Sequence, residues 1–478
     1  HIFFYLKRSK RKFMLTLISI CVKITMFNRE ILYGEVFIIY NDEFYSQNET
    51  FDDFDDNDTL EKIKEHVGRH ADKNHLNIGL FTDTFTPDIN GVSVSVATLR
   101  NELIKMGHNV YVVAPSLDTK LSGTTFSEGI LRMPAVKLTG LYGYRLARPY
   151  SLKALSYIKA MNLDVIHNNT EFSMRILANV ASAAYNIPYV YTYHTLWEDY
   201  TYYINKGYFD KSSRKLVGLY TKHIANNCDE VIVPTEKTAR ILRTYKVCKS
   251  MHVIPTGIDT ERLHPDHIDK VKLSELRRKY GLENSFCMCY VGRIAKEKNM
   301  DFVLDCVGEL KQKIPEFKFV ITGLGPAVDE MKAHSEELGQ QDYVIFTGKQ
   351  PSDQIQYFYA LGDFFCTAST SETQGLTYIE AMASGCPVIA KKDECLNNVL
   401  IDGVNGFAFD TEEELIDSVV KFHDMTEQEK EKMKKKAIEK ADEFSSANFA
   451  KKVLSVYYEA IKNGRKGQNK NINDKVKI

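Results

Sequence analysis

The sequence carries almost no net charge, and its cysteines follow no pattern. Each absence excludes a class of function. The formal net charge is −1 over 478 residues, so no global basic field favours nucleic acid, and we expect no nucleic-acid partner. The nine cysteines include no CxxC pair and no zinc-type spacing. An odd, scattered set predicts reduced thiols in a cytoplasmic protein.

No hydrophobic run is long enough to predict a membrane span with confidence. Met14–Phe27 is largely apolar and follows the basic stretch Lys7–Lys12, but Lys23 interrupts it and no small-residue cleavage site follows. We expect residues 1–74 to form a disordered or weakly ordered extension, with a membrane anchor or a signal peptide as the alternative.

The acidic stretch Asn41–Asp58 contains Asp-x-Asp triplets, a pattern that can hold a metal. Here the stretch has low complexity and no flanking strand, so we predict a solvated segment and no metal site.

From Leu76 onward, short apolar strands alternate with helical stretches, which predicts parallel sheets covered on both faces. One series of strands runs to HVIP near residue 254, and a second begins at CMCYVGR. We therefore predict an α/β protein with two Rossmann-like doubly wound domains facing across a cleft. The predicted bounds are 75–255 and 256–442 for the two domains, 443–463 for a helix that crosses back to the first, and 464–478 for a disordered tail.

The stretch Ser369–Ile389 (STSETQGLTYIEAMASGCPVI) predicts a loop, a helix from Leu376 and a strand. The free amides of Thr373, Gln374, Gly375 and Leu376 at the start of that helix would seat an anion such as a diphosphate. The carboxylates of Glu372 and Glu380 flank this seat and would accept hydrogen bonds from hydroxyl-bearing rings on either side. A nucleotide sugar has this layout, whereas an acidic loop with a surface glutamate is the plain alternative.

Basic residues follow the first strand of the second series, in GRIAKEKN. Arg293 and Lys298 would converge on the same diphosphate and stabilise it as a leaving group without a metal. Gly323 and Gly325 follow the next strand and are a weak signal. Gly91, in the first domain, would let the backbone approach the diphosphate, although it is almost as well explained as a turn glycine.

The first domain offers polar residues at the ends of its strands. His194 ends the strand PYVYTYH and would contact a sugar hydroxyl, while a purely structural histidine is the alternative. Glu171 and Asp199 would act on an acceptor hydroxyl. His167 and Asp83 are weaker candidates.

Lys137, Arg145 and Arg148 are interspersed with Leu and Tyr in VKLTGLYGYRLARPYS. This mixture suits an anionic membrane surface, and the Tyr-rich stretch Tyr200–Phe209 would extend it. An ordinary exposed loop fits the same composition.

Over about Leu76–Lys462 the chain resembles glycosyltransferase family 4, which comprises retaining enzymes of the GT-B fold. Its most specific motifs are the E-x7-E pair Glu372 and Glu380, the run from Gly292-Arg293 to Lys298, and PTGID at Pro255–Asp259. Within the family, the stretches LFTDTFTPDINGVSVSV, YHTLWEDYTYYI and SETQGLTYIEAMASGCPV are most similar to bacterial enzymes that glucosylate 1,2-diacylglycerol.

The resemblance implies a role for each matching residue. Glu372 and the amides of Thr373 to Leu376 would contact the donor sugar and phosphates, and Glu380 would hold the ribose. Arg293 and Lys298 would bind the diphosphate, and His194 would lie near the reacting carbon.

The implied reaction moves glucose from UDP-glucose to diacylglycerol with retention of the α configuration and no required cofactor, on the inner face of the cell membrane. Asn168 and Asn169 occupy two positions where the family pattern has a Thr and either a His or a Gln. This departure affects the assignment of the acceptor and leaves the donor site unchanged. The open alternatives are another lipid or soluble acceptor, a nucleotide-sugar epimerase of the same fold, and a binding protein without activity.

Overall fold

The computed structural model describes residues 56–69, 75–88, 90–117, 123–137, 145–147, 152–194, 211–369, 372 and 374–463. They divide into two compact units, one comprising the chain up to Ile254 and again from Lys452, the other Pro255–Lys451. The predictions for Arg148, Asp199, Thr373, the stretch 200–209 and both chain ends (1–55 and 464–478) lie outside the described residues.

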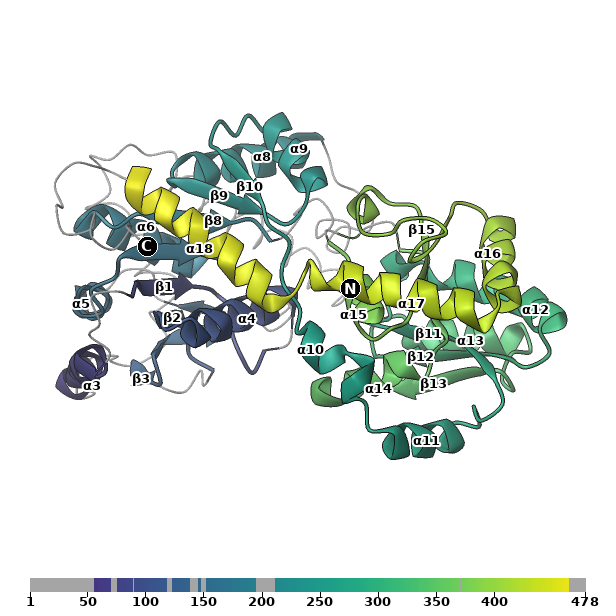
Figure 1. The fold of residues 1–478 in the computed structure, drawn as a ribbon. Helices are drawn as coiled ribbons and strands as arrows, with labels where there is room; N and C mark the ends of the chain where they lie inside the picture. The colour runs from purple at the N-terminus through teal and green to yellow at the C-terminus, as the bar shows by residue number, and fades with distance from the viewer. Residues whose placement is uncertain are drawn as a thin grey trace, which may run out of the picture. The chain divides into compact units, whose positions relative to one another are not determined.

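The first unit is built on an eight-stranded sheet with the order β10-β9-β8-β7-β1-β2-β4-β3 (Figure 1), in which all neighbours are parallel except β3 and β4. The chain reverses its direction of winding between β1 and β7. The strands are β1 (Asn77–Phe81), β2 (Asn109–Pro115), β3 (Thr125–Ser127), β4 (Ile130–Met133), β7 (Val165–Asn168), β8 (Tyr189–Thr192), β9 (Glu230–Val233) and β10 (Met251–Val253), with β5 (Ala135–Lys137) and β6 (Arg145–Ala147) as a separate hairpin.

The helices of this unit are α3 (Asp56–Arg69), α4 (Gly91–Lys105), α5 (Leu152–Ala160), α6 (Ser173–Tyr185), α8 (Lys211–Asn226) and α9 (Glu236–Thr244). Helix α3 lies inside the stretch that the sequence indicated as an extension. It buries Ile63 completely and its Thr59 hydroxyl donates to the Thr124 carbonyl at 3.2 Å. The packed part of the chain therefore starts earlier than the strand pattern indicates.

The second unit contains a six-stranded, all-parallel sheet with the order β13-β12-β11-β14-β15-β16, which reverses between β11 and β14 (Figure 1). Its strands are β11 (Phe286–Val291), β12 (Phe317–Thr322), β13 (Val344–Gly348), β14 (Phe364–Thr367), β15 (Val388–Lys391) and β16 (Gly406–Phe409). Its helices are α10 (Thr260–Leu263), α11 (Lys270–Lys279), α12 (Met300–Lys313), α13 (Val328–Glu337), α14 (Ile355–Ala360), α15 (Leu376–Ala383), α16 (Glu412–Asp424) and α17 (Glu427–Asp442), with short 3₁₀ turns at Pro265–His267, Lys296–Lys298, Ser352–Gln354 and Glu394–Leu396.

The central strands are buried along their whole length because helices cover both faces of the sheets. Every residue of β11 (FCMCYV) and of β14 (FFCT) is buried, and so is every residue of β7 and β9 in the first unit. The predicted doubly wound α/β architecture is confirmed.

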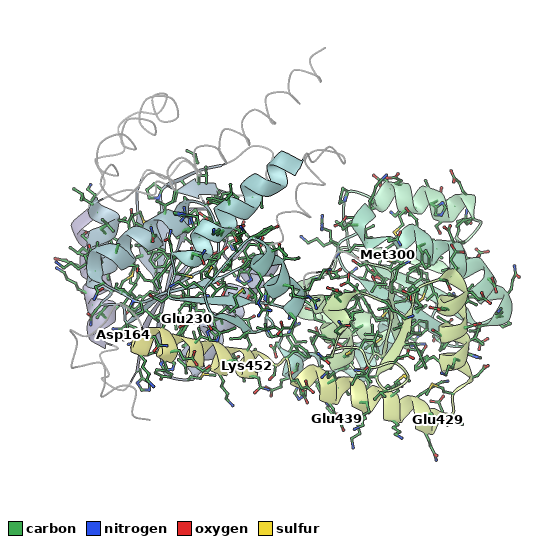
Figure 2. All side chains as sticks on the ribbon, turned by 90° about the horizontal axis from the view of Figure 1, so that it is seen from above. Asp164, Glu230, Met300, Glu429, Glu439 and Lys452 are labelled. Carbon is green, nitrogen blue, oxygen red and sulfur yellow. The ribbon has the colours of Figure 1, made fainter. Side chains whose placement is uncertain are left out.

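The C-terminal helices are amphipathic. Helix α17 buries Met433, Ala437 and Ala441, one turn apart, whereas Glu429, near its start, and Glu439 are exposed (Figure 2). Helix α18 (Ser446–Asn463) begins in the second unit and continues into the first. Among the described residues, no helix combines the length and apolarity needed to cross a membrane.

Within the first unit, α18 is held by polar contacts as well as by its apolar face. The Tyr457 hydroxyl lies 2.7 Å from His167 Nδ1, and both side chains are buried. His252 pairs with Glu230 at 2.9 Å and lies 3.7 Å from Glu459 of α18.

Close backbone contacts shape the loops after β11 and β12. The Gly292 amide donates to the Thr322 carbonyl at 3.0 Å, and the Ile294 amide donates to the Leu324 carbonyl at 3.1 Å. Gly323 has a φ of +143°, and a Cβ there would lie 1.8 Å from the Gly292 carbonyl oxygen. A side chain at Gly323 would therefore push the loop carrying Arg293 and Lys298 away from β12.

We expect Gly323→Ala to destabilise the second unit more than Gly339→Ala does. Gly339 also has positive φ, +68°, but its Cβ would meet nothing within 4 Å, so that variant loses only about 1–2 kcal/mol of conformational energy. Denaturant unfolding of the full chain measures both. Equal losses would show that the contact with the Gly292 carbonyl imposes no constraint.

Candidate active site

The loops that leave β11 and β14 meet at the point where the second sheet reverses its winding. Lys298 lies at the end of the loop after β11, and Glu372 lies in the loop after β14. The two side chains form an ion pair and are 19% and 16% exposed. Open parallel sheets bind ligands at this position, beyond the carboxyl ends of the strands.

Arg293 lies on the same loop as Lys298 but pairs with a different carboxylate. Its guanidinium contacts Glu297, and its side chain is 47% exposed. The Tyr290 hydroxyl donates to the Arg293 carbonyl at 3.0 Å and fixes the backbone beneath it. Both predicted cations therefore lie at the carboxyl edge of the sheet, each against a carboxylate.

The loop before α15 is anchored through Gln374. Its side chain accepts from the Thr256 amide and donates to the Thr256 carbonyl, both at 2.8 Å. Gly375 caps the helix with a left-handed φ of +71°, and a Cβ there would lie 2.2 Å from the Tyr378 ring. The PTGID motif thus has a structural role, since its Thr256 holds the loop that carries Glu372.

Glu380 lies in α15 and is oriented by Tyr359, whose hydroxyl donates to Glu380 Oε2 at 2.6 Å. Burial raises the pKa of Glu380, and the Tyr359 hydrogen bond and the charge of Arg262 oppose this rise. With one oxygen engaged by Tyr359, the carboxylate still has capacity to accept hydrogen bonds from a ligand.

The first unit has a comparable reversal between β1 and β7. The carboxylate at this point, Asp83, has a structural role. Asp83, after β1, accepts hydrogen bonds from the hydroxyls of Thr170 and Ser173 and from the amides of Phe172 and Met174. Burial raises the pKa of Asp83, and these hydrogen bonds oppose the rise. Asp83 thus fixes the loop after β7.

His194 follows β8, and its Nε2 lies 3.2 Å from Asn169 Oδ1. His167 is enclosed, with Nδ1 2.7 Å from the Tyr457 hydroxyl and Nε2 2.6 Å from the Thr192 hydroxyl. Burial lowers the pKa of His194 to about 4 and that of His167 to about 3. Both imidazoles are therefore neutral at physiological pH.

Glu171 is buried, and its Oε1 accepts from the Tyr191 hydroxyl at 2.8 Å. Burial raises its pKa to about 8. The carboxyl group is mainly protonated at neutral pH and acts there as a neutral hydrogen-bonding group.

The remaining predicted residues of the first unit differ in their surroundings. Gly91 opens α4 on the surface, and a Cβ there would meet nothing within 4 Å. Arg145 pairs with Asp88 at 2.8 Å and its side chain is only 16% exposed. Lys137 ends β5 and pairs with Arg145 in the backbone register of the hairpin.

Two family profiles match most of the described chain. The profile described as "Glycosyltransferase Family 4" matches residues 89–262, and the profile "Glycosyl transferases group 1" matches residues 274–441. The alpha-monoglucosyldiacylglycerol synthase of Streptococcus pneumoniae is 36% identical over 81% of this chain and 86% of its own length. This chain belongs to glycosyltransferase family 4. The synthase of the same name from Acholeplasma laidlawii is 31% identical over 72% of this chain and 87% of its own length.

Solved structures show the fold of this glycosyltransferase. Anabaena HepE, solved in complex with UDP-glucose, has a TM-score of 0.61 and 18% identity, covering 80% of this chain and 100% of HepE. Sucrose-phosphate synthase from Thermosynechococcus elongatus has a TM-score of 0.62 and 19% identity, covering 80% of this chain and 98% of its own. The predicted GT-B architecture of two doubly wound domains is confirmed.

The structure adds residues that the sequence patterns of this glycosyltransferase did not single out. Tyr359 orients Glu380, Tyr290 supports the backbone of Arg293, and Asn169 contacts His194. Each is distant in sequence from its partner or has no motif of its own. The Asn at position 169 was the one visible signal, because it departs from the residue expected there.

We expect Glu171→Gln to stabilise the enzyme at alkaline pH. Because the folded-state pKa is raised to about 8, the unfolded chain loses the Glu171 proton first, and the folded state loses stability as the pH rises from about 4.5 to 8. Gln keeps the shape of the neutral carboxyl and removes this loss, which is roughly a few kcal/mol.

Thermal unfolding at pH 5 and pH 8.5 measures the effect, with the exposed Glu337→Gln as the control. A Glu171→Gln enzyme that gains no stability relative to wild type between these pH values would contradict a protonated Glu171.

Proposed function

We propose that this enzyme transfers glucose from UDP-glucose to the free hydroxyl of 1,2-diacylglycerol, as the names of its two synthase relatives indicate for them. The observation that carries the proposal is the Lys298–Glu372 pair at the reversal of the second sheet. It supplies one cation for a diphosphate and one carboxylate for sugar hydroxyls at the position where such sheets bind nucleotides.

The second unit holds the donor. Lys298 and Arg293 bind the diphosphate together with the amides from Thr373 to Leu376 at the start of α15. Glu372 accepts hydrogen bonds from the glucose hydroxyls, and Glu380, oriented by Tyr359, accepts those of the ribose.

The reaction retains the α configuration and needs no metal or other cofactor. The bond between the glucose anomeric carbon and the diphosphate oxygen breaks while the acceptor oxygen bonds to the same face of that carbon. The acceptor proton passes to the departing phosphate oxygen. Lys298 and Arg293 stabilise the negative charge that develops on this leaving group, which is the role a divalent cation plays elsewhere.

The first unit serves the acceptor and the membrane. His194 contacts a hydroxyl of the glucose near the reacting carbon. Glu171 and Asp199 contact the acceptor hydroxyl. Lys137, Arg148 and, once released from Asp88, Arg145 bind the anionic inner face of the cell membrane, where the enzyme is peripheral.

We expect Glu372→Gln to reduce glucosyl transfer by roughly 10²- to 10³-fold, because the lost charge no longer strengthens contacts to the sugar in the transition state. The fold remains, since Gln still accepts a hydrogen bond from Lys298. Labelled UDP-glucose is incubated with mixed lipid and sugar acceptors and the products are identified, with Glu337→Gln as the charge-matched control.

The same incubation separates the alternatives. Formation of labelled α-glucosyl-diacylglycerol supports the proposal. Label on another lipid or on a soluble sugar would show that the acceptor is not diacylglycerol. An epimerase converts the donor without an acceptor, and a binding protein leaves it unchanged. Wild-type transfer by the Glu372→Gln enzyme would remove Glu372 from the mechanism.

Anionic vesicles should raise the activity, and salt should reverse the gain because screening shortens the range of the attraction to about 8 Å at physiological ionic strength. Replacing Lys137 and Arg148 with Ser should lose about 1 kcal/mol of vesicle binding per charge. Cosedimentation with vesicles measures this. The control replaces exposed Lys432 and Lys435 of α17, and equal losses in both pairs would argue against a dedicated basic surface.

A further inference from the structure

Asn169 lies between a backbone carbonyl and the imidazole of His194. Its Nδ2 donates to the His167 carbonyl at 3.2 Å, and its Oδ1 lies 3.2 Å from His194 Nε2. The side chain is 2% exposed. Its backbone amide donates to the Phe81 carbonyl at 2.8 Å, so the residue is held at both ends.

These contacts determine which way the amide points. If the group were flipped, Oδ1 would face the His167 carbonyl oxygen, and two acceptors would meet in a buried space. The donor-acceptor pattern therefore assigns Nδ2 to the carbonyl and Oδ1 to His194.

An oxygen acceptor opposite Nε2 requires a proton on that nitrogen. In a neutral imidazole the other nitrogen then carries the lone pair, so Nδ1 of His194 is a hydrogen-bond acceptor. An acceptor at this position binds a hydroxyl group and repels the oxygen of a carboxylate or phosphate.

We propose that Asn169 is a positioning residue that holds His194 with its proton on Nε2, so that Nδ1 accepts a hydrogen bond from a hydroxyl of the sugar. This inference rests on the proposed function for the identity of the sugar. The assignment of the proton rests only on the contacts of Asn169.

The surroundings of His194 keep it in the neutral form that this role needs. Burial alone lowers its pKa to about 4. Within the described part of the chain, the titratable group whose charge interacts with His194 is His167, whose own pKa is lowered to about 3 by burial and then by His194. His167 has both ring nitrogens occupied, by Tyr457 and Thr192, and it stays neutral beside His194.

Two substitutions in the full-length enzyme separate this role from a merely structural one. Asn169→Asp places a carboxylate opposite Nε2, which keeps the proton there and raises the pKa of His194 by about 1–3 units, while its second oxygen replaces the donor to the His167 carbonyl. Asn169→Leu removes the acceptor while keeping the size of the side chain. Asn168→Leu is the matched control, because the neighbouring Asn168 donates to the Thr170 carbonyl and has no hydrogen bond to His194.

The first measurement is ¹⁵N NMR of histidine-labelled protein, in which His194→Gln identifies the His194 signals. We expect wild type and Asn168→Leu to carry the proton on Nε2 and Asn169→Leu to give a mixture of both tautomers. A proton on Nδ1 in wild type, or an unchanged tautomer in Asn169→Leu, would overturn the proposal. This readout needs no activity, so it stands even if glucosyl transfer to diacylglycerol is not found.

The second measurement is the pH dependence of kcat/KM with UDP-glucose. Because only neutral His194 accepts the hydroxyl, the loss of activity on the acid side should move up by about 1–3 pH units in Asn169→Asp. Asn169→Leu should lower kcat/KM about 5- to 10-fold at pH 7, which corresponds to one hydrogen bond. An acid limb at the wild-type pH in Asn169→Asp would show that Asn169 does not act through His194.

Discussion

The ion pair between Lys298 and Glu372 connects the two loops that form the proposed donor site of this enzyme. Neither loop is positioned by the pair alone. The loop after β11 lies against β12 because Gly323 has no side chain, and the loop after β14 is held by the two hydrogen bonds between Gln374 and Thr256. In the proposed reaction the diphosphate takes over Lys298. Lys298 thereby exchanges one anionic partner for another, and Glu372 accepts hydrogen bonds from the sugar hydroxyls in place of its ion pair.

The side chains at the points where the two sheets reverse their winding differ in charge. In the second unit, Lys298 and Arg293 are ion-paired at the carboxyl edge and available to a strongly anionic ligand. In the first unit, burial keeps His194 neutral and Glu171 protonated, and it raises the pKa of Asp83 within a closed set of hydrogen bonds. A neutral imidazole and a protonated carboxyl group suit sugar and glycerol hydroxyls, which matches the division between donor and acceptor that we propose.

The sequence was sufficient for the architecture because the buried strands, such as FCMCYV, are continuous apolar runs that only a covered parallel sheet explains. It also indicated that Lys298 and Glu372 would lie at the same edge of one sheet, since both follow its strands, but not that they would pair with each other. It was not sufficient for the contacts that orient these residues. Gln374 and Thr256 are far apart in the chain, so no local pattern links them. Tyr359 fits the pattern of buried positions in α14, which gives no sign of its hydrogen bond to Glu380. Asp83 resembles a catalytic acid in the sequence, although in the structure it holds the loop after β7. Polar contacts of this kind depend on tertiary distances that no local pattern encodes.

A continuous path of hydrogen bonds leads from the C-terminal helix to His194. Tyr457 of α18 contacts His167 Nδ1, the His167 carbonyl accepts from Asn169, and Asn169 contacts His194. Tyr457 and Asn169 are uncharged groups and burial keeps both histidines neutral, so each hydrogen bond lies in a medium of low polarity where an unpaired group is costly. A change at Tyr457 would thus act on His194 by leaving His167 without its partner and not by altering a charge. The amphipathic pattern that packs α18 onto the first unit therefore also supports the hydrogen-bonded residues that hold His194.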